Sequence, residues 1–410
     1  MVEAFIQLPE AWRAAIVGLL SLIVARGINW AIYNWAYHRR AIGPWVPPQS
    51  GARRWSEHLP VVGWWLLRRE YAAFSVWTWL RPLSLELLLP VFLTYYYLAY
   101  THGISLPPGV VLDPFMQALH WQFVAHYVLF SLMTVATFID FDEQSIPDYV
   151  TIPGTCIALA GALFAPSWYP MDAFGTIQEL HACSPRRWDP QLDTVVGLRW
   201  GLIIIAVWFF ALLDRRWIGR QGIQRAIVYF LARILRSRTV LFSVAIGAAI
   251  MLALTLYGWL AARPGRWTFL LSGLFGLAFA GGVTWAVRIT ASVGLGVEAL
   301  GFGDVTLMAM IGAFLGWQPS LLIFFLAPLV AIVFVIVRWL LTGETATPYG
   351  PYLCAATALL LLFWNALWTA WAAAVFASLG TVVIAIVIGC VALMGVLLWI
   401  WRLVKETLLH

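Results

Sequence analysis

A cluster of carboxylic acids lies at the end of an apolar segment, in the stretch FIDFDEQSIPDYVTIP (138–153). Its members are Asp140, Asp142, Glu143 and Asp148. Ionisable side chains at membrane depth are costly and usually mark function. An Asp in this place could transfer protons if a second carboxylic acid lay next to it.

A second stretch, EALGFGDVTLMAMIGAFLGW (298–317), places Asp304 after Gly301 and Gly303 and at the start of an apolar helix. Glycines let the backbone approach another segment closely, and an Asp in the first turn is favoured by the helix N-terminus. The same residues also fit a capped membrane helix with small residues for packing. The short motif alone therefore leaves a catalytic and a structural interpretation open.

Asp140 and Asp304 together have the chemistry of an aspartic protease. Two adjacent carboxylic acids share one proton, so that one is charged and the other is neutral. The charged acid takes a proton from a water that attacks a peptide carbonyl, and the neutral acid polarises that carbonyl or protonates the leaving amine. The two roles are not assigned to individual residues, because coupled acids titrate as a pair. The seven His residues are scattered without metal-site spacing, and no Ser/His/Asp or Cys/His set competes.

The elements that would position these acids are membrane helices. Of the 410 residues, 62% are hydrophobic and 11% are charged, whereas about a quarter of the residues in a soluble domain are charged. A spanning helix needs roughly 20 mostly apolar residues, and the sequence contains about eleven such runs. They lie near 13–36, 83–103, 120–140, 149–168, 197–213, 239–262, 267–287, 302–317, 319–341, 352–369 and 375–401. The predicted fold is an all-α, polytopic membrane helix bundle.

The distribution of Lys and Arg predicts the orientation of this bundle. Arginines concentrate in the connections 37–82 and 214–238, and basic residues follow the last span. These segments are predicted to be cytoplasmic, with the N-terminus outside and the C-terminus inside. Four predicted spans separate Asp140 from Asp304, so both acids should lie at the cytoplasmic ends of their helices. Within the second connection, RAIVYFLARILRSR (225–238) fits either a helix along the anionic inner leaflet or a solvated loop.

The two acidic stretches resemble motifs of the type IV prepilin peptidases, membrane aspartic proteases of the G-x-G-D class. The family has an Asp seven residues before a Pro that is followed by Asp or Asn, and Asp140, Pro147 and Asp148 have that spacing here. The family's G-x-G-D-V-K-L and G-A-x-L-G-W are similar to GFGDVTL and GAFLGW within 301–317. Both motifs stand in the family's order.

Two shorter similarities accompany these motifs. TPYGPYLCAA (347–356), which contains Gly350 and Pro351, is similar to the family's I-P-F-G-P-F-L. GINWAIYNW places Asn29 and Tyr33 in register with the family's first helix.

The resemblance, which covers roughly 13–153 and 298–360, implies cleavage of leader peptides from prepilins or pseudopilins. Cleavage would occur at the cytoplasmic face of the bacterial inner membrane, just before the substrate's apolar segment, in a type IV pilus or type II secretion system. The resemblance assigns catalysis to Asp140 and Asp304. It implies supporting positions at Asp142, Pro147, Asp148, Gly301, Gly303, Gly350 and Pro351. The implied partners are substrate helices and membrane lipid, without nucleic acid or a cofactor, and the oligomeric state is left open.

Three features depart from the family pattern. The connection 37–82 lacks the paired C-x-x-C cysteines that many bacterial members use to bind zinc, so zinc is not expected and the associated N-methylation loses its support. Thr306 replaces the Lys of the second motif. The interval between Asp140 and Asp304 is 164 positions. The excess length is interpreted as an insertion at 175–290, either a partner-docking element or a neutral elaboration.

The sequence is accordingly divided into five predicted regions. They are a first transmembrane helix at 1–36, a basic cytoplasmic loop at 37–82, a membrane core with the first motif at 83–174, the inserted spans and basic segment at 175–290, and a membrane core with the G-x-G-D motif at 291–410. No pair of cysteines has C-x-x-C spacing, so neither a zinc site nor a disulfide framework is indicated. The cysteines are Cys156, Cys183, Cys354 and Cys390.

Three other interpretations stay open. A proton-coupled transporter or channel would use the acids to carry protons, but the acids lie at helix ends and no inverted repeat is apparent. A catalytically inactive relative, retained as an assembly factor, would agree with Thr306 and the missing cysteines. A G-x-G-D protease that cuts other membrane proteins would need its acids deeper in the bilayer than these span boundaries place them.

Overall fold

The computed structural model describes most of the chain. The described residues are 2–38, 42–48, 53–68, 70, 75–170, 189–211, 224, 227–229, 231–232, 241–261, 265–297, 299–342, 348–380 and 382–408. The basic stretch 225–238 lies largely outside them, as do Arg39, Arg40, Arg69 and Cys183.

Helices are the only regular elements among the described residues, which confirms the all-α prediction. The helices of the first half are α1 (Val2–Ile6), α2 (Glu10–Trp35), α3 (Val62–Leu67), α4 (Trp77–Thr101), α5 (Met116–Glu143), α6 (Asp148–Phe164) and α7 (Val195–Ala211). Those of the second half are α10 (Gly247–Ala261), α11 (Arg266–Leu295), α12 (Phe302–Leu315), α13 (Trp317–Thr342), α14 (Gly350–Leu362), α15 (Ala373–Leu379) and α16 (Val382–Leu408).

Seven helices in the described part of the chain are long and apolar enough to cross a membrane. They are α2, α4, α5, α10, α11, α13 and α16. α14 and the segment ending in α15 form a bent pair that would count as an eighth span, whereas α6, α7 and α12 are shorter. The 14 residues of α12 extend about 21 Å, less than the roughly 30 Å of a bilayer's hydrocarbon core. The total of about eleven crossings and their orientation therefore stay predictions.

The last two predicted spans, 352–369 and 375–401, have different boundaries in the structure. α14 ends at Leu362, and a π-helix at Asn365–Ala372 continues into α15 at an angle of 78° to α14. Gly380 then has a φ of +54°, which favours glycine and lets the chain turn before α16. The apolar pattern found the helices but not the bend, because a π-helical turn changes the backbone bonding without changing the hydrophobicity.

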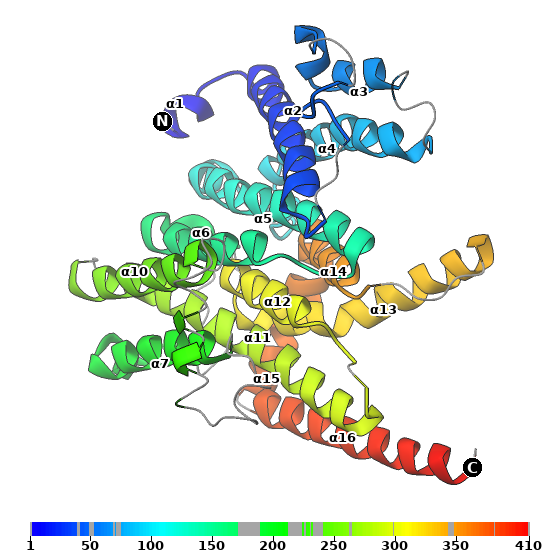
Figure 1. Cartoon of the computed structure of the whole chain (residues 1–410). Helices are drawn as coiled ribbons and strands as arrows, with labels where there is room; N and C mark the ends of the chain where they lie inside the picture. The colour runs from blue at the N-terminus through cyan, green and yellow to red at the C-terminus, as the bar shows by residue number, and fades with distance from the viewer. Residues whose placement is uncertain are drawn as a thin grey trace.

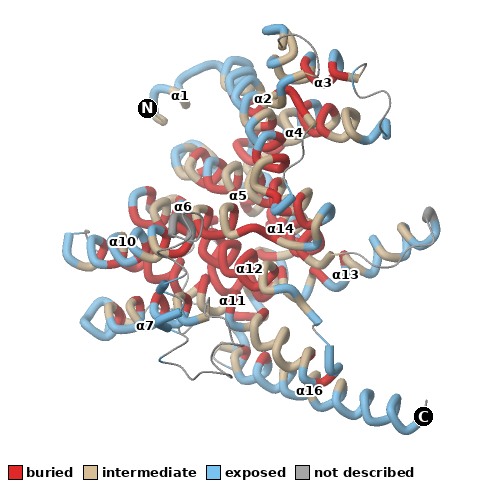
Figure 2. The backbone as a smooth tube through the Cα atoms, in the orientation of Figure 1, coloured by how far each residue is buried: buried red, intermediate tan, exposed pale blue. Residues whose placement is uncertain are grey.

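α12 is the central helix of the molecule (Figure 1). Every residue from Asp304 to Leu315 is buried, and Figure 2 shows this helix enclosed by its neighbours. The helices that pack against it include α6, α11, α13 and α14. α11 comes closest where Gly276 faces Gly312, because a Cβ at either position would collide with the backbone of the other helix. This close packing fixes the position of the helix that begins with the G-x-G-D motif.

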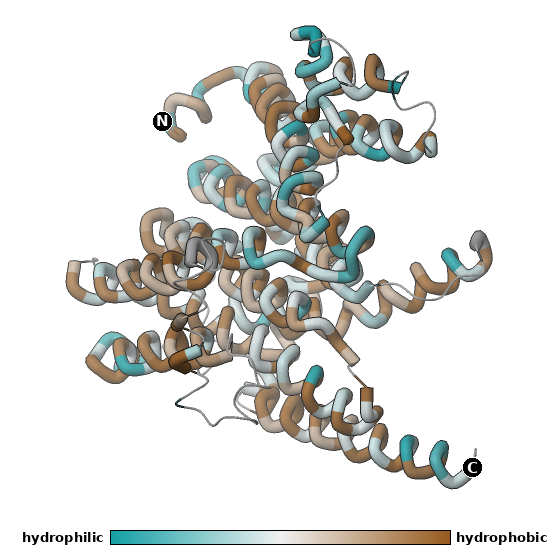
Figure 3. The backbone as a smooth tube through the Cα atoms, viewed as in Figure 1, coloured by the Kyte–Doolittle hydropathy of each residue, from teal (hydrophilic) through white to brown (hydrophobic). Residues whose placement is uncertain are grey.

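Apolar side chains cover much of the outer surface. Figure 3 shows hydrophobic residues along the outward faces of α7, α10, α13 and α16, and hydrophilic residues around α3 and at the turn between α5 and α6. Exposed apolar side chains on α13 and α16 include Leu329, Ile332, Val333, Leu393 and Trp399. A lipid environment explains such a surface, since water would not favour it.

Candidate active site

Asp140 lies in the last turn of α5, with its side chain directed into the bundle. It is only 4% exposed, whereas its neighbour Phe141 is exposed. The backbone N–H of Gln144 donates to the carbonyl of Asp140 over 2.8 Å, and Gln144 has a φ of +52°. This left-handed residue ends the helix and turns the chain toward α6. α5 therefore stops within one turn of the buried acid.

Asp304 is the third residue of α12 and is 7% exposed. The backbone N–H of Gly301 donates to Oδ2 of Asp304 over 3.2 Å, as in a helix N-terminal cap. Arg288 of α11 holds the preceding turn, because its Nε donates to the carbonyl of Leu300 over 2.8 Å. The charge of Arg288 also acts on Asp304. The acid is thus fixed by its own turn and by the neighbouring helix.

The motifs around Asp140, Asp304 and Gly350 converge at Ile146, in the turn after α5. A Cβ at Gly303 would lie 2.9 Å from Cβ of Ile146, and a Cβ at Gly350 would lie 2.8 Å from Cδ1 of Ile146. The same atom at Gly350 would lie 2.5 Å from Oδ2 of Asp140. A side chain at Gly303 would therefore collide with the backbone of Ile146, and one at Gly350 would displace the Asp140 carboxyl group or the Ile146 side chain.

The two acids are close enough to interact electrostatically. Oδ2 of Asp140 is buried and makes no hydrogen bond in the described part of the chain. The backbone of Gly350 faces the carboxyl group of Asp140. An unpaired buried carboxyl oxygen is costly unless another group comes to meet it. The site therefore holds two neighbouring acids, and the Asp140 carboxyl group faces the backbone of Gly350.

Tyr349 and Cys354 complete the surroundings of the pair. Burial, and then the charge of Asp304, raises the pKa of Tyr349, which precedes the first residue of α14. The thiol of Cys354, one turn into α14, interacts electrostatically with both Asp140 and Asp304. Sequence reasoning did not single out Tyr349 or Arg288. Position 349 has Tyr where the family motif has Phe, and this difference could have drawn attention to Tyr349. No pattern in the sequence pointed to Arg288.

The other acids of the first motif hold helices together. Arg81 of α4 donates two hydrogen bonds to the two carboxylate oxygens of Asp142, over 2.7 and 2.9 Å. Glu143 accepts from the backbone N–H groups of Tyr37 and His38, both over 2.8 Å. These contacts attach α4 and the end of α2 to the end of α5.

The remaining motif residues have local roles. Pro147 precedes the first residue of α6 in an extended conformation, and Asp148 is the first residue of that helix. The hydroxyl of Thr306 donates to the carbonyl of Gly303 over 3.0 Å, so it binds within its own helix. Pro351 follows Gly350 in the first turn of α14, where its missing N–H costs no hydrogen bond.

A buried polar cluster organises the connection between α2 and α4. The side chain of Glu86 is fully buried. It accepts hydrogen bonds from Asn29 Nδ2 and Trp64 Nε1 over 3.0 Å and from the Val61 N–H over 2.5 Å. Arg26 Nη1 lies 3.3 Å from the same carboxylate. The connection is therefore anchored to α2 and α4 through one glutamate, and the residues described contain no group of three or more His, Cys, Asp or Glu placed to bind a metal.

The comparisons with known proteins point to one family. Residues 227–336 match the model of the type IV leader peptidase family. This segment includes α11, α12 and Asp304, and it begins inside the predicted insertion 175–290. Asp140 and Gly350 lie outside the matched residues.

Curated relatives give the same result over part of their length. A prepilin leader peptidase/N-methyltransferase of Pseudomonas aeruginosa is 38% identical over 117 residues, which are 28% of this chain and 40% of the relative. A protein of the same name from Aeromonas salmonicida is 36% identical over 92 residues, which are 22% of this chain and 31% of the relative. The match thus spans less than half of either relative. No solved structure gives a significant match. Residues 227–336 are therefore similar to the type IV leader peptidase family, and these relatives support that similarity.

Proposed function

We propose that this protein is an aspartic endopeptidase that removes leader peptides from prepilins or pseudopilins at the cytoplasmic face of the bacterial inner membrane. The observation that carries the proposal is the meeting of Asp140 and Asp304 in one buried site. These residues stand far apart in the sequence and end or begin separate helices. The match of residues 227–336 to the type IV leader peptidase family supports protease chemistry, and the relatives' names supply the substrate class.

In the proposed reaction, the two acids act on one water and one peptide bond. The ionised acid takes a proton from the water, and the water oxygen forms a bond to the carbonyl carbon. The neutral acid gives its proton to the carbonyl oxygen, so the tetrahedral intermediate carries no full negative charge. When the C–N bond breaks, the acid that took the water proton gives it to the leaving amine, and a hydroxyl of the intermediate returns its proton to the other acid as the carbonyl reforms. The products are a carboxylic acid and an amine, and the pair returns to one shared proton.

The surroundings of the acids favour this state. Two ionised carboxylates in one buried site repel each other, so a single shared proton is the favoured arrangement. Gly350 brings backbone to the side of Asp140 with no side chain between them. The backbone of a substrate must also come close to the acids at the bond that is cut, and the absence of a side chain at Gly350 leaves room for it.

The leader of a prepilin is basic, and the predicted cytoplasmic connection of this protein is also rich in arginine. Simple attraction between opposite charges therefore does not explain how the leader would bind. Of the arginines in the described part of the connection, Arg53 pairs with Glu70, Arg81 pairs with Asp142, and Arg68 stacks on Trp65. Recognition in the proposal therefore depends on the apolar segment of the substrate more than on its charge.

Peptidase activity is proposed without methyl transfer. The names of the relatives include N-methyltransferase. The connection 37–82 has no cysteine, and the buried Glu86 cluster holds its described part in place.

The test is cleavage of a prepilin by the purified full-length protein. Asp140→Asn and Asp304→Asn are each expected to lower kcat by at least about 100-fold, because either change removes proton transfer by the pair. Asp113→Asn is the control, because Asp113 is exposed and precedes the first residue of α5, at the opposite end of the helix from Asp140. Normal cleavage by either active-site variant, with an unchanged thermal unfolding temperature, would assign the chemistry to other residues.

A further inference from the structure

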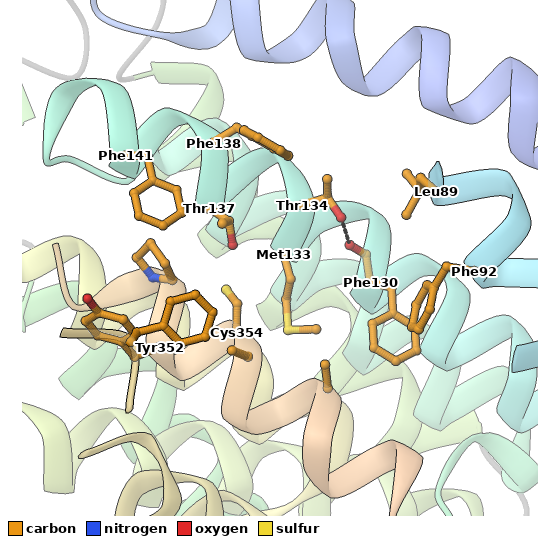
Figure 4. A pocket seen from close by; sticks show the side chains of 14 residues that line it. Leu89, Phe92, Phe130, Met133, Thr134, Thr137, Phe138, Phe141, Tyr352 and Cys354 are labelled. Carbon is orange, nitrogen blue, oxygen red and sulfur yellow. Dashed lines mark hydrogen bonds between the residues drawn. The ribbon is translucent and has the colours of Figure 1, made fainter. Parts of the chain in front are cut away.

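An apolar groove opens beside Asp140, between α4, α5, α13 and α14. Its volume is about 300 Å³. Figure 4 shows Phe141 and Thr137 toward one end and Phe92 and Leu89 toward the other, with Cys354 on the facing wall. The groove is large enough for apolar side chains of a helix, though not for a whole helix.

The groove lies next to the candidate active site, and its lining includes neighbours of Asp140 and Gly350 but neither acid. Met133 and Thr137 precede Asp140 by seven and three residues, a spacing that places them on the same face of α5. On the opposite wall, Pro351 follows the glycine that faces Asp140, and Cys354 interacts electrostatically with both acids. The groove and the candidate active site are therefore both bordered by α5 on one side and by the start of α14 on the other.

The groove also follows the membrane-spanning direction. From Phe141 to Phe130 the lining residues of α5 extend about 16 Å along the helix. Two aromatic side chains stand at its rim, because Phe141 is 45% and Phe334 is 52% exposed. A helix lying in the bilayer against α5 would thus meet an aromatic rim and an apolar groove.

We propose that this groove binds bulky apolar side chains of the substrate's membrane helix and so places the bond to be cut at Asp140. This inference rests on the proposed peptidase function and adds a docking site to it. The substrate's apolar helix directly follows the bond that is cut, so a groove that leads from Asp140 into the bilayer receives that helix in the correct direction. A lipid acyl chain would fill the same space, but it has no backbone to present to the acids.

A second apolar groove provides a matched comparison. It has a volume of about 260 Å³ and lies between α7, α11 and α12. Its α12 residues are Phe302, Val305, Thr306 and Ala309. At 100° per residue these residues lie on the side of α12 away from Asp304. The second groove therefore resembles the first in size and character but does not lead to the acids.

The test fills each groove in turn. Ala358→Phe fills the groove beside Asp140, and Ala278→Phe fills the second groove, since both alanines are partly exposed lining residues. The purified full-length variants are assayed with a complete prepilin and with a short peptide that spans the junction but lacks the apolar helix. Ala358→Phe should lower kcat/KM for prepilin about tenfold or more, mainly through KM. It should leave peptide cleavage unchanged, and Ala278→Phe should change neither substrate.

Three results would overturn the proposal. Ala358→Phe could cleave prepilin normally, or it could lose kcat/KM equally for prepilin and for the short peptide. Alternatively, Ala278→Phe could lose as much kcat/KM for prepilin as Ala358→Phe does. Failure of the wild-type protein to cleave any prepilin would instead contradict the proposed function. The two failures are therefore distinguishable.

Crosslinking keeps the inference testable if Ala358→Phe does not fold. In an Asp140→Asn background with the natural cysteines replaced by Ser, Ala358→Cys should form a disulfide with a cysteine placed in the apolar helix of prepilin. Ala278→Cys should not. Crosslinks from Ala278→Cys alone, or from neither variant, would show that the substrate helix does not occupy the groove beside Asp140.

Discussion

At the scale of single residues, the structure separates acids that look alike in the sequence. Asp140 is buried and has an oxygen without a hydrogen bond, whereas Asp142 accepts two hydrogen bonds from Arg81. Two positions along a helix rotate the side chain by about 200°, so neighbouring acids point to opposite surroundings. The residue type alone does not distinguish these acids, and their place on the helix does.

Gly350→Ala should damage the site directly. The new Cβ would lie 2.5 Å from Oδ2 of Asp140, so the carboxyl group or the start of α14 must move. We expect kcat to fall about 10- to 100-fold, as for small displacements of catalytic groups. Gly389→Ala is the control, because a Cβ at Gly389 meets nothing within 4 Å. Wild-type kcat in Gly350→Ala would show that the tight contact does not position Asp140.

Asp142→Asn should weaken stability and spare catalysis. The change removes a charge-assisted pair with Arg81 that is only partly exposed, and its expected cost in unfolding free energy is about 1 kcal/mol. A double-mutant cycle with Arg81→Gln, measured by chemical denaturation, isolates the pair. A loss of cleavage as large as that in Asp140→Asn, without loss of stability, would contradict the structural role.

At the scale of elements, short contacts between helices position the acids. The turn after α5 lies against the start of α12, and the start of α14 lies against both Asp140 and Ile146. A second junction lies around Glu86, where α2, α4 and the segment before α3 meet. Each junction brings together segments that are distant in sequence.

Glu86→Ala should release the connection between α2 and α4. The change leaves the Asn29 amide, the Trp64 indole N–H and the Val61 N–H without their buried acceptor. The expected loss of stability is roughly 3 kcal/mol or more, since each buried unsatisfied group costs about 1–3 kcal/mol. Hydrogen–deuterium exchange should rise in the segment 55–67. Glu3→Gln is the control, because Glu3 is exposed, and unchanged exchange in Glu86→Ala would refute the anchoring role.

At the scale of the whole molecule, the sequence predicted the helices and the acids, but not how they meet. Apolar runs and motif spacing are local patterns. The apolar runs were therefore enough to predict the helices, and the motif spacing was enough to single out Asp140 and Asp304 as candidates. The contacts of Ile146 and the position of Arg288 were not, because they depend on packing between distant segments. The bend between α14 and α15 was missed for a different reason, since it changes bonding and not composition.

Chelators should leave proteolysis unaffected. The connection 37–82 contains no cysteine, and a carboxylic acid pair needs no metal. Prepilin cleavage is therefore expected to be the same with and without a zinc chelator, when measured on protein whose metal content has been determined. Inhibition that added zinc reverses would reveal a metal site in the functional protein.

The enclosure of α12 has a consequence for how this protein meets its surroundings. Every residue from Asp304 to Leu315 is buried against other parts of the same polypeptide, so annular lipid has little access to this part of α12. Protein groups, more than lipid, therefore determine the dielectric environment of Asp304. Membranes of different fatty-acid composition would then alter the outer helices long before they alter the interior that surrounds the acid.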